Sequence, residues 1–135
     1  MEKFVIFEKA EWPLVIGTFT GQKADVANFD LYLEEMTALY HPKVPFSIIF
    51  DATHAKVLPP AMIKKQADWM ENHQEIMVNY LSGIAYVIPS SIMRGILRAI
   101  FSLQKQPSPY TVVPDVQEAR DWVNNLPGFS LTSTS

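Results

Sequence analysis

The sequence predicts a single α/β domain with a mostly parallel sheet, an antiparallel hairpin at its start, and helices on both faces. Two segments rich in β-branched and aromatic residues open the chain, which is typical of paired strands. Short apolar runs then alternate with segments of helical period, as in parallel strands joined by helices. The chain of 135 residues suits one domain, and its 48% of hydrophobic residues can build a core.

The N-terminal part predicts two strands, a helix and a third strand. Residues 3–9 and 13–21 form the hairpin. Residues 24–41 change to the helical period, and the proline that follows ends this helix, because a residue before proline is pushed out of helical geometry. Residues 45–51, PFSIIFD, are a continuous apolar run, which is typical of a strand that is covered on both faces.

The rest of the chain continues the alternation, so the predicted order is β-β-α-β-α-β-α-β-α. Pro60 suits the first turn of a helix, Ser90 or Ser91 can cap the next one, and Asp115 with Glu118 has the spacing of a capping box. Residues 1–129 are assigned to the domain and residues 130–135 to a mobile tail. The predicted elements are a helix at 60–80, a strand at 83–88, a helix at 91–105, a strand at 109–113, and a last helix from 115.

Composition excludes several classes of function. The net charge of −3 gives no field that attracts nucleic acid. The chain has no cysteine, which excludes disulfides and thiolate chemistry. His41, His54 and His73 lack metal-binding spacing, and no glycine-rich phosphate loop is present. We therefore predict no metal, no cofactor and no nucleic-acid partner, and we interpret His73 as a core-edge histidine with one hydrogen bond.

The chain also lacks the sequence features of membrane insertion. No apolar run approaches the roughly 20 residues of a membrane span. Charged residues interrupt the apolar segment at the N-terminus, so it does not resemble a signal peptide. These features predict a cytoplasmic protein.

Asp51, Thr53 and His54 follow the predicted central strand, where open α/β sheets usually bind ligands. An aspartate three residues before a histidine can orient the imidazole for general-base catalysis. In the alternative interpretation, Asp51 accepts backbone N–H bonds within the loop and Thr53 does so more weakly. We favour this structural interpretation, because the sequence contains no nucleophile elbow and names no second catalytic partner.

The predicted helix at 91–105 is apolar over an unusually wide arc. Its polar stripe is narrow and consists of Arg94, Arg98, Ser102 and Lys105. The apolar arc spans roughly 200°, whereas a surface helix needs roughly 100° to cover its core. We expect Met93, Leu97 and Phe101 to face something other than the sheet. The apolar residues are Ile92, Met93, Ile96, Leu97, Ala99, Ile100, Phe101 and Leu103.

Three explanations of this wide arc remain open. Neighbouring helices of the same chain can cover it, or it can form a surface for a second copy or another protein. It can also line a cleft for an apolar ligand between the second and third predicted helices. In that case Arg94 or Arg98 would hold the phosphate or carboxylate of the ligand at the rim, although such a pair can also form a solvated face.

Four features match a known family: the strand end IIFDAT, Trp69, the segment GIAYVIPSSIMRGILRAIF and the closing PSPYTVVPDVQEARDWVNNL. Through these features the chain resembles the STAS domain superfamily, in particular its SpoIIAA-like branch. This resemblance spans most of the chain. It implies a bacterial signalling module that interacts with other proteins. The SpoIIAA-like branch is related in shape to the CRAL-TRIO lipid-transfer proteins, which implies lipid or acyl-chain binding as a second function.

One departure from the family concerns regulation. Phosphorylatable STAS proteins carry an Asp-Ser-Ser-Gly-type turn before the second helix, whereas this chain has Val57-Leu58-Pro59-Pro60 there. The nearest hydroxyl, on Thr53, lies at the strand end instead. We therefore expect a module that is not switched by the usual serine phosphorylation.

The sequence thus predicts a non-enzymatic interaction or regulatory module, which binds a protein partner or a second copy through its third helix and the adjacent loop. An apolar-ligand binding protein is the second hypothesis, and a hydrolase or isomerase built on Asp51 and His54 is the third. The predicted binding residues are Asp51, Thr53, His54, Met93, Arg94, Leu97, Arg98 and Phe101.

Overall fold

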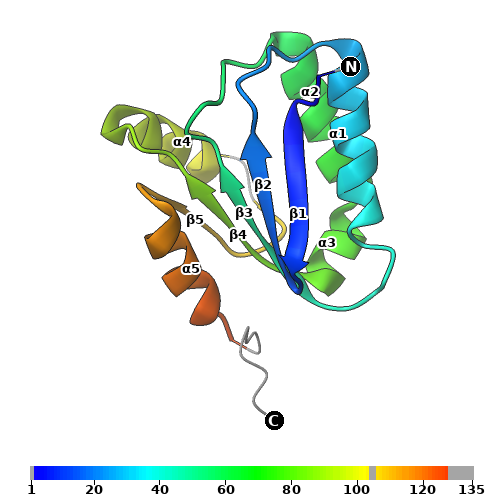
Figure 1. Ribbon diagram of the computed structural model, residues 1–135, viewed down its shortest axis with the longest axis vertical. Helices are drawn as coiled ribbons and strands as arrows, with labels where there is room; N and C mark the ends of the chain where they lie inside the picture. Colours follow the sequence, from blue (N-terminus) through cyan, green and yellow to red (C-terminus); the bar gives the residue numbers. More distant parts are fainter. Residues whose placement is uncertain (1, 104–105, 128–135) are drawn as a thin grey trace.

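The computed structural model describes residues 2–103 and 106–127. Its elements follow the predicted order, except that the second helix is divided in two (Figure 1). The predicted tail at 130–135 and the predicted helix end at Lys105 lie outside the described residues. The elements are β1 (Val5–Glu11), β2 (Leu14–Phe19), α1 (Val26–Ala38), β3 (Phe46–Asp51), α2 (Pro60–Asn72), α3 (Gln74–Tyr80), β4 (Leu81–Val87), α4 (Ser91–Leu103), β5 (Tyr110–Val113) and α5 (Val116–Asn124).

His73 divides the helix that was predicted at 60–80. Its Nδ1 lies 2.6 Å from the carbonyl oxygen of Trp69, which the His73 N–H would bind in a continuous helix. That N–H instead donates to the carbonyl of Met70. The side chain thus competes with the backbone, and the chain leaves helical geometry at this residue. The half-buried ring also stacks on Trp69, so the prediction of a core-edge histidine with one hydrogen bond is confirmed.

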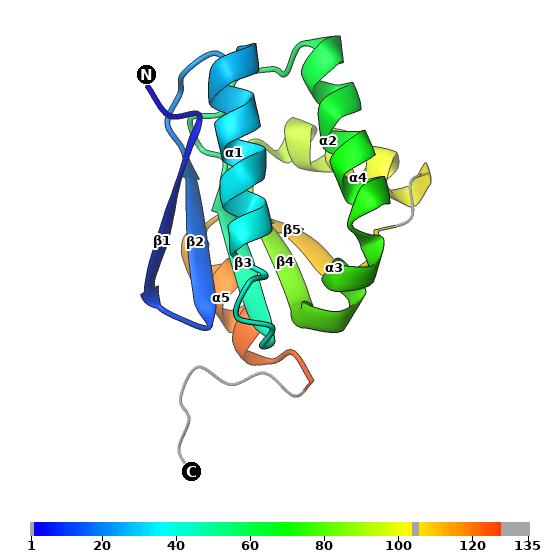
Figure 2. The same ribbon diagram turned by 90° about the vertical axis from the view of Figure 1, so that its right-hand side faces the viewer.

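The five strands lie in the sheet in the same order as in the chain. β1 and β2 pair antiparallel and the other neighbours pair parallel, which confirms the predicted hairpin and parallel remainder. Right-handed crossovers that always advance in one direction place their helices on one face. α1, α2 and α3 accordingly cover one face, and α5 lies on the other, so helices on both faces are also confirmed (Figures 1 and 2). α4 packs at the β4–β5 side of the sheet, where its Phe101 contacts Tyr86 and Tyr110.

The two faces carry separate cores. The α1–α3 side is rich in aromatic residues, including Phe29, Phe46 and Trp69, whose indole N–H donates to Thr37 Oγ1 over 3.0 Å. The other side is smaller and joins α5 to the central strands through aliphatic residues such as Val123. α5 approaches β4 closely, because a Cβ atom at Gly83 would lie only 2.9 Å from the Trp122 ring.

An aromatic row crosses the sheet on the α1–α3 side and leads toward α4. Gly17 pairs with Phe7 on one side and Phe50 on the other, and Phe50 pairs with Tyr86. A Cβ atom at Gly17 would lie 3.0 Å from the Phe50 ring, so glycine leaves room for its two aromatic neighbours. Phe50 and Tyr86 stack with their ring centroids 5.9 Å apart. The row therefore ends at the strand that precedes α4.

None of the helices in residues 2–103 and 106–127 combines the length with the apolar composition that a membrane span requires.

Candidate functional site

The candidate site is built on α4, which is separated from the end of β4 by three residues. The Ser90 hydroxyl accepts a hydrogen bond from the Met93 N–H over 3.2 Å, as expected for an N-cap residue. Of the two serines predicted as caps, Ser90 and Ser91, Ser90 is therefore the N-cap of α4. This cap fixes the start of α4 at the carboxyl end of the strand, next to the loop that follows β3.

The two arginines of α4 bind the backbone of their own chain. Arg94 Nη1 donates to the carbonyl oxygens of Ile88 and Pro89, each over 2.8 Å. Arg98 Nη2 donates to the carbonyl oxygen of Val112 over 2.8 Å. Hydrogen bonds with a charged donor are among the stronger ones in proteins. Arg94 and Arg98 are therefore directed at the sheet edge. From the sequence we expected them to hold the charged group of a ligand or to face solvent, and this arrangement was not predicted.

The Val112 carbonyl lies on the open edge of the sheet. The N–H groups of Ile84 and Ile88 in and after β4 donate to the carbonyls of Pro109 and Val113. Carbonyls alternate in direction along a strand, so the Val112 carbonyl points away from β4. Such unpaired edge groups invite pairing with a foreign strand. Arg98 therefore covers a backbone group that would otherwise be free to pair.

Because the arginines fix the inner side of α4, its apolar side faces outward. Ile92 is 74% exposed, Ile96 47% and Met93 43%. Gly95 and Ala99 are exposed as well, and a Cβ atom at Gly95 would meet nothing within 4 Å. We call these five residues the outward face of α4. It carries no charge, which is the reverse of an ordinary surface helix.

The sequence predictions for this helix are met in part. Met93 faces solvent, as predicted. The prediction is wrong for Phe101, because its ring packs 5.4 Å from Tyr86 and 4.9 Å from Tyr110, measured between centroids. Leu97 is half-buried. Ile92 and Ile96 were missing from the predicted site. Their position opposite Arg94 and Arg98 on the helical wheel indicates them only once the arginines are known to face the sheet edge.

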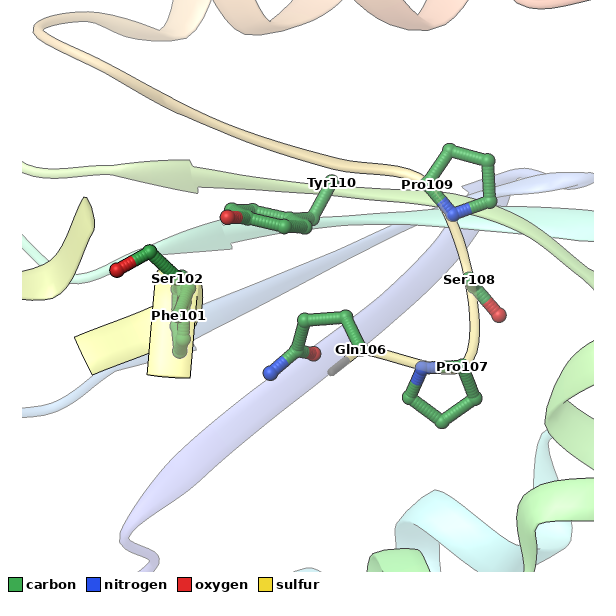
Figure 3. Close-up of a pocket in the computed structure, with 7 residues that line it drawn as sticks. All are labelled: Phe101, Ser102, Gln106, Pro107, Ser108, Pro109 and Tyr110. Atoms are coloured by element: carbon green, nitrogen blue, oxygen red, sulfur yellow. The ribbon is translucent and has the colours of Figure 1, made fainter. Parts of the chain in front are cut away.

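An open pocket of about 630 Å³ lies between the end of α4 and the segment before β5 (Figure 3). Phe101 and Tyr110 form its aromatic part, and Gln106 contributes an amide group. The Ser108 hydroxyl points away from the pocket and donates to the carbonyl of Met77. No residue of α2 or α3 lines this pocket, so it differs in place from the cleft that the sequence predicted between the second and third helices.

The loop after β3 has the geometry of a structural turn. Asp51 Oδ1 accepts hydrogen bonds from the Thr53 N–H over 3.1 Å and from the Thr53 hydroxyl over 2.5 Å. His54 is exposed, and within the described part of the chain no hydrogen bond joins it to Asp51. These contacts support the structural interpretation of the turn. The loop is tied to β4 by a bond from the Ala52 N–H to the Val87 carbonyl, so it lies beside the start of α4.

Nor do the described residues place three histidine or acidic side chains where they could hold a metal ion.

Comparison with known proteins identifies the fold. No family model matches the chain, and no curated protein matches it. A solved structure does match, that of an uncharacterized protein of the DUF3478 family with a SpoIIAA-like fold from Shewanella loihica PV-4. The alignment has a TM-score of 0.66 at 15% identity and covers 87% of this chain and 90% of that one. The chain therefore has the SpoIIAA-like fold, which confirms the predicted fold class.

Proposed function

We propose that this chain is a non-enzymatic interaction module that binds another protein through the outward face of α4. The observation that carries the proposal is the orientation of the helix. The guanidinium groups of Arg94 and Arg98 donate hydrogen bonds to backbone carbonyls. On the opposite side of the helix, Ile92, Met93 and Ile96 face solvent. Exposed apolar surfaces of this kind mark interaction sites.

The exposed side chains provide binding energy for a partner. Full burial of an isoleucine or methionine side chain contributes about 1.5–3 kcal/mol. Because Ile92 is 74% exposed and Ile96 47%, covering both offers a partner about 2–4 kcal/mol in total, without any charged group to desolvate. The adjacent turn at Asp51 and Thr53 widens the surface, because the Ala52 N–H holds this loop against the end of β4.

The likeness to STAS domains supports a regulatory role for this interaction, but without the serine switch. α2 begins at Pro60, and its N-cap residue Pro59 has no side-chain hydroxyl or capping bond. A phosphoryl group thus has no acceptor where the switch of that family lies. Regulation through the interaction surface itself fits the chain better than regulation by serine phosphorylation.

The second candidate function is binding of an apolar small molecule, such as a lipid or an acyl chain. The pocket beside Phe101 and Tyr110 favours it, because about 630 Å³ falls within the range of small-molecule sites. Its aromatic wall suits an apolar ligand, and the Gln106 amide can bind a polar end group. Binding of a small molecule is the second candidate, because the pocket is open to solvent whereas α4 presents three exposed apolar side chains.

Site-specific photo-crosslinking tests the proposed function. A photoreactive amino acid replaces Ile96 on the outward face, or Val78 on α3, which is also an exposed apolar helix residue. Irradiation in the cells that make the protein should give protein adducts from position 96 and none from position 78. Equal yields from both positions, or no protein adduct from position 96, would contradict the proposal. A monomer that gains only a few hundred daltons would support the second candidate instead.

A further inference from the structure

We infer that the partner of the outward face is a second copy of this chain, bound through an antiparallel pair of α4 helices about a two-fold axis. This inference rests on the proposed function and deepens it. It is carried by the charge and the shape of the face.

The charges around α4 favour a neutral protein surface as the partner. Each copy has a net charge of −3, but the outward face has no charged side chain, so two copies meet there without opposing like charges. A helix that lies on a membrane presents lysine and arginine beside its apolar face. Here Arg94 and Arg98 are instead turned toward the carbonyls of Ile88, Pro89 and Val112.

The shape of the face is self-complementary, which a two-fold contact requires. Ile92 and Ile96 are one turn apart and form a ridge. Gly95 and Ala99 are also one turn apart and form a shallow groove beside that ridge. Nothing lies within 4 Å of a Cβ position at Gly95, so the groove is open. Because each copy offers both features, the ridge of one helix can fill the groove of the other.

The size of the face predicts a weak dimer. α4 has 13 residues, which corresponds to a length of about 20 Å. A helix pair of this length buries less than the roughly 800 Å² per partner of a standard stable interface. Association should therefore depend on concentration and reverse on dilution, as in transient complexes.

Sedimentation velocity of the full chain over a wide concentration range tests this inference. The mass of the wild type should rise from 15.3 kDa toward twice that value as concentration increases. Ile96→Glu should keep the protein monomeric at every concentration, because it places a carboxylate at the centre of the two-fold contact. Val78→Glu, the matched control, should associate like the wild type. Circular dichroism of each variant establishes that it is folded.

A second variant tests the groove without adding charge. Gly95→Val fills the groove and should weaken association at least tenfold. Association that survives both Ile96→Glu and Gly95→Val would overturn the inference, because the contact would then lie elsewhere. A wild type that stays monomeric at all concentrations would overturn it as well.

The two proposals fail in distinguishable ways. A monomeric wild type whose position 96 still crosslinks to another protein overturns the second copy as partner and leaves the proposed function intact. A monomeric wild type without protein adducts overturns both. Monomeric protein that binds phosphatidylglycerol vesicles, and loses this binding in Ile96→Glu, also overturns both, because the outward face would then serve a lipid surface.

Discussion

Arg98 and Val112 are joined by a hydrogen bond of 2.8 Å between a guanidinium nitrogen on α4 and a backbone carbonyl on the edge strand β5. This bond has two effects. It covers an edge group that could pair with a foreign strand, and it sets the rotation of α4 about its own axis. The same contact that protects the sheet edge therefore exposes Ile92 and Ile96 on the opposite side of the helix.

Arg98→Gln should loosen α4 from the sheet edge. Hydrogen bonds to charged groups contribute about 1.5–3 kcal/mol, and the exposure of Arg98 reduces this to about 1 kcal/mol. We expect the amides of β5 and α4 to exchange faster in hydrogen-exchange mass spectrometry. Lys64→Gln, which breaks only an exposed ion pair with Asp68, should leave their exchange unchanged. Identical exchange in wild type and Arg98→Gln would show that the bond does not hold α4.

Alanine at two glycines should have opposite effects on stability. At Gly83 the new Cβ would lie 2.7 Å from Leu126 Cδ1 and 2.9 Å from the Trp122 ring, so α5 must shift. Overpacking of this kind costs about 1–3 kcal/mol. At Gly95 the Cβ meets nothing, and the higher helix propensity of alanine should add about 1 kcal/mol. Urea unfolding of dilute protein measures both changes, and a neutral Gly83→Ala would mean that α5 is free to move.

The ion pair between Arg120 and Glu11 should make stability depend on pH in the acidic range. Its two hydrogen bonds, of 2.9 and 2.7 Å, tie α5 to the end of β1. The hydrogen bond from Arg120 holds the pKa of Glu11 below its ordinary value of 4.5. A carboxylate with a lowered pKa stabilises the folded state fully above that ordinary value, and this contribution is lost as the pH falls through the lowered pKa.

Glu11→Gln tests this pH dependence. The variant should be less stable than the wild type at neutral pH, and the difference in urea midpoint should shrink as the pH falls below 4.5. A difference that stays constant down to the acid limit would contradict a contribution from the ion pair. Glu8→Gln is a suitable control, since Glu8 is an exposed carboxylate on the same strand.

Two buried tyrosines should respond differently to loss of the hydroxyl group. The Tyr32 hydroxyl donates to Gln66 Oε1 over 3.0 Å, so Tyr32→Phe should destabilise the protein by about 1 kcal/mol. The Tyr40 hydroxyl is buried and has no partner among the described residues. Tyr40→Phe should therefore be neutral or should raise stability by up to about 1–3 kcal/mol. Thermal unfolding measures both, and equal losses would show that the Tyr40 hydroxyl is bonded in solution.

The order and type of the elements could be predicted from the sequence, because local signals specify them. Apolar runs indicate the buried strands β3 and β4, and Pro60 and Asp115 mark the starts of α2 and α5. The break at His73 could not be predicted in this way. It depends on a ring nitrogen that reaches the Trp69 carbonyl, and nothing in the helical period indicates that competition.

The orientation of α4 could not be predicted from the sequence either. Periodicity shows which residues share a side of a helix but not which side faces the protein. Burial usually decides, and it would turn the apolar side inward. Here Arg94 and Arg98 find carbonyl acceptors, and one of these, Val112, is 14 residues away from its arginine. Such an acceptor can be identified only when the position of β5 relative to α4 is known.

The agreement between strand order and chain order also bears on how the molecule assembles during synthesis. Each strand pairs with the strand made just before it, so no early strand waits for a distant partner. Each parallel pairing still has to close a connection that contains a helix, and such non-local pairing is slower than the pairing of the β1–β2 hairpin. The chain can nevertheless add β3 and β4 to the hairpin as they emerge from the ribosome. α5 follows all five strands in the sequence, and until it docks, Ile49 and Ala85 stay uncovered on the opposite face. This face of the sheet therefore stays open to contact with other chains until α5 has docked.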